Sequence, residues 1–227
     1  MKLRALVVDD HKVVRAGLCL LLKQIGDIEI VGEACDGKVA VQLARQLAPD
    51  FILMDISLPG LNGLDATRRI RQDVPTAKVI ILSMHATEAM VLEAIRAGAS
   101  CYVTKEAPPE ELKMAIDSAI ADRTFLSPSV SRFVVNDYLR VSRGESPESS
   151  GTGIDTLTSR QREVLQLLAE GKRTRDIAGR LSLSAKTIET HRSEIMRKLA
   201  VTSVAELVRL AMRAGIVPIE AQLADQT

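Results

Sequence analysis

The sequence predicts an α/β domain with a doubly wound parallel sheet, followed by a smaller domain built only of helices. Up to residue 121, short apolar runs alternate with segments whose apolar residues recur at helical spacing. After residue 154, only the helical spacing continues. Strands that alternate with helices form parallel sheets with helices on both faces, so we assign residues 1–121 to the first domain and 155–217 to the second.

Five strands are expected in the first domain. The stronger ones are apolar throughout, which is typical of strands that are covered on both faces of a sheet. The five expected strands lie at residues 6–8, 28–34, 51–54, 79–82 and 101–104. Helical patterns separate them, and the last of these helices begins near Pro108 and Pro109, which suit the first turn of a helix.

Residues 122–154 are expected to form a linker. Residues 125–140 are expected to contain a short helix, and the next segment reads SRGESPESSGTG, a composition typical of a flexible chain. Four helices are predicted in the second domain, at residues 158–169, 174–181, 185–199 and 203–214. Residues 218–227 are expected to be a tail.

Composition and charge narrow the class of protein. Hydrophobic residues make up 46% and charged residues 26%, which is ordinary for a globular protein. We see no signal peptide and no apolar run near the ~18 residues that span a bilayer, so we expect a cytoplasmic protein without membrane contact. The three cysteines are scattered without metal-ligand spacing and are expected to be reduced thiols.

The net charge differs between the two domains. Residues 1–121 contain 14 Lys and Arg against 16 Asp and Glu, whereas residues 155–217 contain 12 against 7. The second domain is therefore the one expected to meet a polyanion. A chance fluctuation would explain the charge difference equally well.

Reactive side chains follow the predicted strands. Asp9 and Asp10 follow the first strand and Asp55 follows the third. Ser83 and Lys105 follow the fourth and fifth. The carboxyl ends of parallel strands meet at one edge of a sheet, so we expect these side chains to gather there.

This set of side chains predicts phosphoryl chemistry. Three carboxylates repel one another and attract a divalent cation, and a few oxygen ligands suit Mg²⁺. Asp55 is the best candidate nucleophile because it follows a fully apolar strand, and its attack would give an aspartyl-phosphate. Lys105 would hold a phosphoryl oxygen, and the Ser83 hydroxyl would reach the same group. Each residue alone has a structural alternative, as a helix cap or an ion pair.

Four motifs in this region resemble the receiver domain of response regulators: VVDDH at 7–11, LMDISLPGLNGLDA at 53–66, ILSMHA at 81–86 and AGASCYVTKEA at 97–107. The resemblance implies a flavodoxin-like, CheY-like fold in which Asp55 accepts a phosphoryl group from a sensor histidine kinase. It further implies that Asp9, Asp10, Asp55 and the main-chain carbonyl of Ser57 hold Mg²⁺. Ser83 and Lys105 would sense the phosphoryl group, and Tyr102 would change rotamer on activation.

The segment 174–199 has the pattern of a helix-turn-helix, with Thr174 and Ser184 as expected caps. At about 100° per residue, Ile188, Ile195 and Leu199 mark the buried side of its second helix. The outward side then carries Lys186, Thr190, Ser193 and Arg197, with Glu189 and Glu194 beside them and Thr187, His191 and Lys198 along one flank. A solvated polar face without a ligand is the alternative, and the two acids give it weight.

Residues 157–201 resemble the LuxR-type domain of NarL/FixJ response regulators. The resemblance implies binding to double-stranded DNA, with Glu189, Thr190 and Ser193 at base-reading positions. Near the DNA backbone it places Lys186, His191, Arg192 and Lys198. A second apolar side of the last helix, made of Ala205, Val208 and Met212, then implies a homodimer that reads a pseudo-palindromic site. A single broad core face would explain that side equally well.

Together these observations predict a transcriptional regulator that phosphorylation of Asp55 controls. RNA polymerase is a further candidate partner. Two alternatives stay open at this point. The first domain could be a docking module without a phosphorylation switch, or it could be an aspartate-nucleophile phosphatase that turns over a substrate. The presence of Asp9, Asp10, Asp55 and Lys105 argues against the former, and the DNA-binding partner domain argues against the latter. We expect a regulator, not a turnover enzyme.

Overall fold

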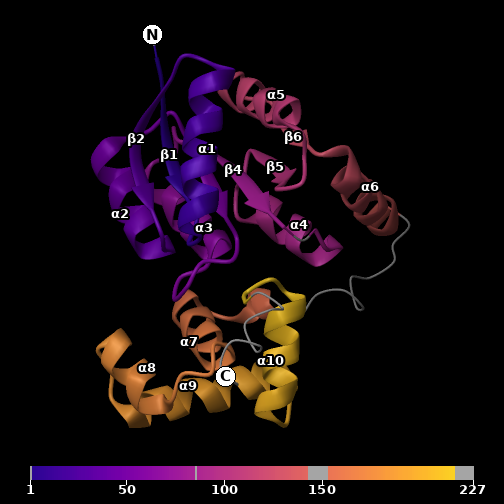
Figure 1. Cartoon of the computed structure of the whole chain (residues 1–227). Coiled ribbons are helices and arrows are strands. Elements are labelled where there is room, and N and C mark those ends of the chain that lie inside the picture. Colours follow the sequence, from indigo (N-terminus) through magenta and orange to yellow (C-terminus); the bar gives the residue numbers. More distant parts are fainter. Residues whose placement is uncertain (1, 85, 143–152, 218–227) are drawn as a thin grey trace. The chain divides into compact units, whose positions relative to one another are not determined.

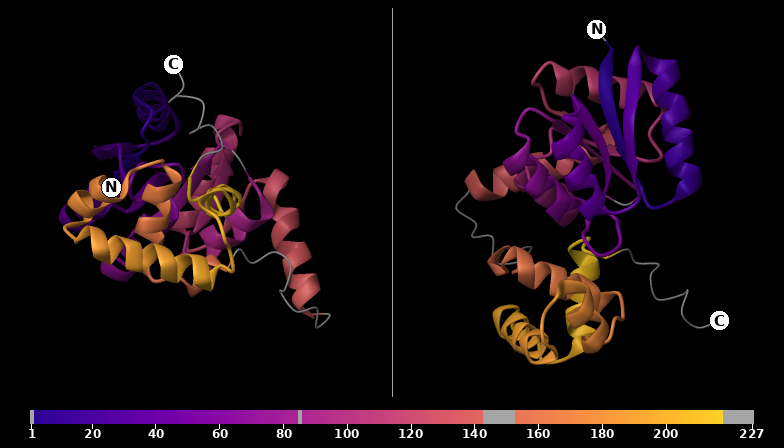
Figure 2. Two further views of the ribbon diagram at one scale, coloured as in Figure 1. Left: turned by 90° about the horizontal axis from the view of Figure 1, so that it is seen from below. Right: turned by 90° about the vertical axis from the view of Figure 1, so that its left-hand side faces the viewer.

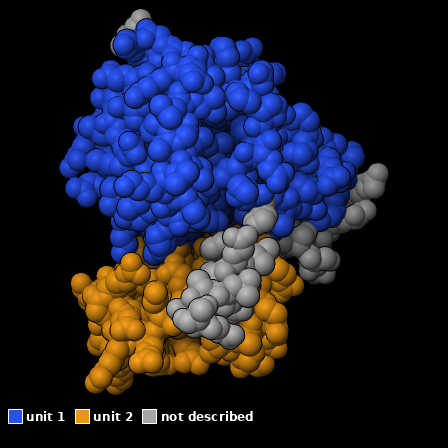
Figure 3. Space-filling model, in the orientation of Figure 1, with its two compact units in different colours: residues 1–146 blue, residues 147–227 orange. Residues whose placement is uncertain are grey.

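The computed structural model describes residues 2–84, 86–142 and 153–217. The chain divides into two compact units, residues 1–146 and residues 147–227, which Figure 3 shows in two colours. Residues 143–152 of the predicted flexible segment and the predicted tail 218–227 lie outside the described residues. Among the helices of the described residues, none combines the length and the apolar character that a membrane span needs.

The first unit is built on a parallel sheet with strand order β2-β1-β3-β4-β5-β6 (Figure 1). Its strands are β1 (Leu3–Val8), β2 (Ile28–Ala34), β3 (Phe51–Asp55), β4 (Lys78–Ser83), β5 (Cys101–Thr104) and β6 (Phe125–Leu126). Strand order reverses between β1 and β3, which pair with Val8 beside Met54. Ligands of open α/β sheets bind beyond the carboxyl ends of the strands at such a reversal.

Helices cover both faces of this sheet, as Figure 2 shows from two sides. Alternate strand residues point to opposite faces. Leu6 and Val8 join one apolar cluster with residues of α2 (Gly37–Leu47), α3 (Gly63–Asp73) and α4 (Glu88–Arg96). Ala5 and Val7 join the other cluster, with residues of α1 (Lys12–Ile25) and α5 (Pro109–Ile120). Both faces are therefore buried, which explains the continuously apolar strands.

The predicted doubly wound parallel fold is confirmed, and the sheet has one strand more than expected. Residues 125 and 126 lie in the segment expected to contain a short helix, but they form β6 and pair in parallel with Cys101 and Tyr102. The helix begins only at Pro128. A proline disfavours helical backbone in the residue before it, so α6 does not extend back to Ser127. The Ser127 side chain then donates to Glu111 Oε2 at 2.7 Å.

Helix α6 (Pro128–Ser142) belongs to the first unit, although its residues were expected to form part of a linker. Val130 is fully buried in the core, and Phe133 and Val134 pack against it. α6 contacts α4, and an ion pair of 3.4 Å joins Arg140 of α6 to Glu88 of α4. Apolar residues at helical spacing on one side of α6 thus anchor it to the receiver-like unit.

The second unit is entirely helical within its described residues. It consists of the short 3-10 helix η1 (Ile154–Thr156), α7 (Ser159–Ala169), α8 (Thr174–Leu181), α9 (Ala185–Lys198) and α10 (Val204–Arg213). These helices share one aliphatic core, in which Val164, Ile177, Ile188 and Leu207 are fully buried. The four predicted helices are confirmed to within one residue at each end, whereas η1 was not predicted.

Side-chain caps start most of these helices. Thr158 with Gln161 and Ser203 with Glu206 form capping boxes, and Ser184 caps α9 as predicted. The prediction that Thr174 caps α8 is wrong, because Arg173 occupies the cap position and makes no side-chain cap bond. Thr174 is the first residue of α8, and its hydroxyl instead donates to Glu189 Oε1 of α9 at 2.8 Å.

Gly63 brings α3 against the end of β3. Its N–H donates to the Ile56 carbonyl at 2.9 Å. A Cβ at this position would lie 1.9 Å from the Asp55 carbonyl oxygen. The Asp55 and Ile56 atoms next to this position belong to the backbone and cannot move aside, so this close approach requires glycine.

We expect Gly63→Ala to lower the free energy of unfolding of the first unit by about 3 kcal/mol, the upper end for overpacking against rigid neighbours. Gly17→Ala is the matched control, because the space around Gly17 on α1 is open. This control should stabilise by about 0.5–1 kcal/mol, the usual gain in a helix interior. Urea unfolding followed by tyrosine fluorescence measures both variants, since the two tyrosines, Tyr102 and Tyr138, lie in the first unit. Equal stability of Gly63→Ala and wild type would contradict the close approach.

Candidate functional site

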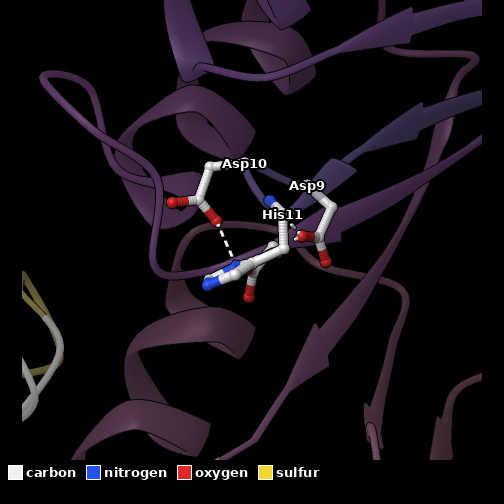
Figure 4. Close-up of side chains that lie close together, drawn as sticks. Asp9, Asp10 and His11 are labelled. Carbon is white, nitrogen blue, oxygen red and sulfur yellow. Dashed lines mark hydrogen bonds and ion pairs between the residues drawn. The ribbon is translucent and has the colours of Figure 1, made fainter. Parts of the chain in front are cut away.

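An acidic cluster lies where β1 and β3 end (Figure 4). Asp9, Asp10, His11 and Asp55 each offer one ligand atom, and these atoms all lie within 4.8 Å of one another. Asp9 and Asp55 are buried, whereas Asp10 and His11 are exposed. The structure therefore brings together the three carboxylates that sequence reasoning assigned to one edge of the sheet.

The Lys105 ammonium group lies between two of these carboxylates. Its Nζ is 2.7 Å from Asp9 Oδ2 and 3.0 Å from Asp55 Oδ2. Pairing of β4 with β5 brings the lysine there, because the Lys105 N–H donates to the Ser83 carbonyl at 2.9 Å. Burial, the largest influence, favours the neutral amine, but the carboxylates of Asp55 and Asp9 outweigh it and raise the pKa of Lys105.

Burial makes the ionised form of Asp55 costly. Desolvation raises the pKa of Asp55 above its ordinary value, the Asp9 charge adds to the rise, and Lys105 opposes it. Two of the three carboxylates thus share one lysine cation, and Asp10 lies beside His11 instead. The donor atoms that they offer are oxygens, which hard divalent cations such as Mg²⁺ prefer. The residues present therefore fit a divalent cation.

Two further predicted residues lie beside this cluster. Ser83, at the end of β4, and Tyr102 of β5 are buried, and their side chains are hydrogen-bonded to each other. Burial raises the pKa of Tyr102 to about 12, and the Asp55 carboxylate contributes to the rise. A hydroxyl pair is thus placed within the electrostatic reach of Asp55.

The loop after Asp55 bonds back onto this carboxylate. The Ser57 N–H donates to the Asp55 side chain, and Asn62 caps α3 by accepting from Asp65 N–H at 2.9 Å. The predicted role of the Ser57 carbonyl as a metal ligand stays a prediction.

Sequence reasoning missed two residues that hold Asp9. The His11 N–H donates to Asp9 Oδ1 at 2.8 Å, and its Nδ1 lies 2.7 Å from Asp10 Oδ1. Arg15 donates through Nη1 to the Asp9 carbonyl at 2.6 Å. The position of His11 two residues after Asp9, typical of a side chain that bonds the backbone ahead of it, was the available signal.

In the second unit, α9 carries the predicted polar side. Ile188, Ile195 and Leu199 are buried, as the helical spacing predicted. The opposite side forms a shallow depression lined by Lys186, Glu189, Thr190, Ser193, Glu194 and Arg197. These residues repeat at intervals of three and four, so they share one face of the helix.

Several of the predicted DNA contacts make bonds within the unit. Lys198 Nζ donates to the Thr156 carbonyl and to Gln161 Oε1, both at 2.8 Å. Glu189 accepts from Thr174, and Arg192 lies 3.7 Å from Glu189. The Thr187 and Ser184 hydroxyls are 2.8 Å apart.

His191 differs from these residues. Its ring lies partly buried, and its Nδ1 has no hydrogen-bond partner within the described part of the chain.

The predicted dimer face of α10 is only partly free. Ala205 is exposed, whereas Val208 and Met212 are half-buried and pack against the core of the unit. Leu207, Leu210 and Ala211 are buried on the other side of the helix.

Two family models match the chain. The model for the response regulator receiver domain matches residues 5–117, and the model for bacterial regulatory proteins of the luxR family matches residues 155–211. Response regulator GacA of Pseudomonas aeruginosa is 34% identical over 215 residues, covering 95% of this chain and 98% of GacA. Oxygen regulatory protein NreC of Staphylococcus carnosus is 35% identical over 212 residues, covering 93% and 97%.

A solved structure of RcsB from Salmonella enterica serovar Typhimurium is also similar. It was determined bound to promoter rprA in the presence of the phosphomimetic BeF3−. RcsB is 25% identical with a TM-score of 0.61, over 92% of this chain and 98% of that one. With an acidic cluster and a lysine at the strand ends of one unit and an exposed polar helix in the other, the chain belongs to the NarL/FixJ-type response regulators, which join a receiver domain to a LuxR-type DNA-binding domain.

Proposed function

We propose that Asp55 accepts a phosphoryl group from a partner histidine kinase or a small phosphodonor, and that this reaction controls DNA binding by residues 155–217. One observation carries the proposal: the buried Asp55 carboxylate lies 3.0 Å from Lys105 and within 4.8 Å of ligand atoms of Asp9 and Asp10. A carboxylate oxygen of Asp55 attacks phosphorus, and the bond from phosphorus to the donor breaks.

The carboxylates of Asp9, Asp10 and Asp55, with the Ser57 carbonyl, would hold Mg²⁺. When bound, this ion supplies positive charge that offsets the carboxylates and the incoming phosphoryl group. Lys105 holds a phosphoryl oxygen in the product, and Ser83 donates a hydrogen bond to another. Movement of Ser83 toward the phosphoryl group breaks its bond with Tyr102, so that Tyr102 changes rotamer. The phosphoryl group is later lost by hydrolysis at the same site, without turnover of a substrate.

For DNA, we propose that α9 enters the major groove. Glu189, Thr190 and Ser193 read base edges, because they line the outward depression of α9. Basic side chains of the same helix contact phosphates: Lys186, Arg192 and Arg197. The two copies of a homodimer contact through Ala205, Val208 and Met212, so the site would be pseudo-palindromic. Because bacterial DNA lies in the cytoplasm, the protein acts there.

The phosphorylation proposal is tested by incubating the full chain with acetyl phosphate and Mg²⁺. Intact-mass spectrometry should show the gain of a single phosphoryl group, which Asp55→Asn abolishes because the nucleophilic oxygen is lost. Asp117→Asn, on the exposed side of α5, is the control and should be phosphorylated like wild type.

Three results would contradict this proposal in different ways. A mass gain in Asp55→Asn would place the acceptor elsewhere. No gain in wild type would favour a docking module that works without phosphorylation. Steady release of phosphate that Asp55→Asn abolishes would indicate an aspartate-nucleophile phosphatase.

The Mg²⁺ site is tested by stability. A ligand that binds only the folded state at 100 times its Kd raises the free energy of unfolding by about 2.7 kcal/mol. We expect Mg²⁺ to stabilise the first unit of wild type and of Asp117→Asn, and to have little effect on Asp10→Asn. Tyrosine fluorescence during urea unfolding, with and without Mg²⁺, measures the difference. Equal stabilisation of all three proteins would rule out Asp10 as a ligand.

The DNA interface is tested by substitutions on α9. Arg197→Met should weaken binding to every sequence and reduce the dependence on salt by about one released ion, because one phosphate contact is lost. Thr190→Ala and Ser193→Ala should change which sequence is preferred, measured by selection from a random pool. Arg213→Met, on α10, is the control for a lost surface charge. A uniform loss from all three α9 variants would refute the division into phosphate and base contacts.

A further inference from the structure

Gln161 of α7 is a buried polar residue whose amide is bonded on both sides. The residue is only 4% exposed. Its Oε1 accepts from the Thr158 N–H at 3.1 Å and from Lys198 Nζ at 2.8 Å. Its Nε2 donates to Glu194 Oε2 at 2.8 Å. One glutamine on α7 therefore bonds two residues of α9.

Lys198 extends this connection to η1. Its ammonium group also donates to the Thr156 carbonyl at 2.8 Å, so two of its three donors serve the unit itself. Glu194 and Lys198 are four residues apart and lie on the same side of α9. The C-terminal half of α9 is thus bonded to α7 and η1 at two points, one helical turn apart.

Directional hydrogen bonds of this kind fix the rotation of α9 about its axis, which apolar packing alone does not fix. Contacts of Ile188 and Ile195 with the core are non-directional, so they permit small rotations of α9 about its axis. A rotation of about 20° moves an outward side chain by about 2 Å, given a helix radius of about 5–6 Å with side chains. That displacement is enough to break a hydrogen bond to a base edge.

We propose that Gln161 and Lys198 are positioning residues for DNA recognition. They set the rotation of α9 and so present Thr190 and Ser193 to the bases, although Gln161 itself is buried. Lys198 acts mainly through Gln161 and Thr156, and not as a phosphate contact. This inference rests on the proposed role of α9 in DNA binding.

Salt dependence separates positioning from phosphate contact. The full chain, incubated with acetyl phosphate and Mg²⁺, is titrated with two DNA duplexes: one of mixed sequence and one selected by wild type from a random pool. We expect Lys198→Met to weaken binding to the selected duplex about ten-fold, the effect of losing a charge-assisted hydrogen bond, with no change in salt dependence. Lys186→Met is the matched control, because this lysine lies on the outward side of α9, and it should reduce the salt dependence by about one released ion.

Gln161→Met tests the same connection from its buried side. It should weaken binding to the selected duplex as Lys198→Met does, and the double variant should lose little more than either single variant. Wild-type affinity of Gln161→Met would overturn the proposal. A reduction in salt dependence for Lys198→Met, equal to that for Lys186→Met, would overturn it as well, because Lys198 would then be a phosphate contact.

Hydrogen exchange without DNA gives a readout that does not depend on binding or on the folding of Gln161→Met. Amides in the last two turns of α9 should exchange faster in Lys198→Met than in wild type, and at the wild-type rate in Lys186→Met. Unchanged exchange in Lys198→Met would refute positioning even where α9 binds DNA. If wild type selects no duplex from the random pool, the proposed function on which the inference rests is refuted instead.

Discussion

The receiver domain depends on one lysine that compensates buried carboxylates. β1, β3 and β5 end at the same edge of the sheet and bring Asp9, Asp55 and Lys105 together. Two buried carboxylates this close to each other would repel without a cation, and leaving a buried charge unpaired is strongly destabilising. Among the residues that the structure describes, no lysine pairs with the exposed Asp10. This edge of the sheet therefore has more negative than positive charge, which suits a divalent cation. The excess follows from the strand order, which brings the three carboxylates to one edge.

The strands and the polar residues at their ends could be predicted from the sequence, because burial on both faces of a sheet produces a recognisable local pattern. A strand covered on both faces must be apolar at every position, so Phe51–Asp55 marks both the strand and its polar end. Because parallel strands end at the same edge of a sheet, the position of these ends can be predicted without knowing any side-chain contact. The two-residue strand β6 shows no such pattern, because it is short and only half-buried and its pairing depends on the edge offered by β5.

The contacts that orient side chains could not be predicted in the same way. Gln161 and Lys198 are 37 residues apart, and each has an ordinary local explanation, as a capping-box residue and as a surface cation. Thr174 looked like a cap because threonine favours that position, yet its hydroxyl bonds Glu189 on the neighbouring helix. The local conformational preference of a residue type predicts where it occurs in a helix, whereas its role also depends on its tertiary contacts.

Anchoring of α6 to α4 has a mechanical consequence for a regulator of this design. Helix α4 is the next element after β4, which ends at Ser83, and its Glu88 forms an ion pair with Arg140 near the end of α6. The buried Val130 attaches the start of α6 to the same core. A displacement of α4 relative to the sheet therefore carries the end of α6 with it. If a flexible chain began directly after α5, its residues would move independently of α4.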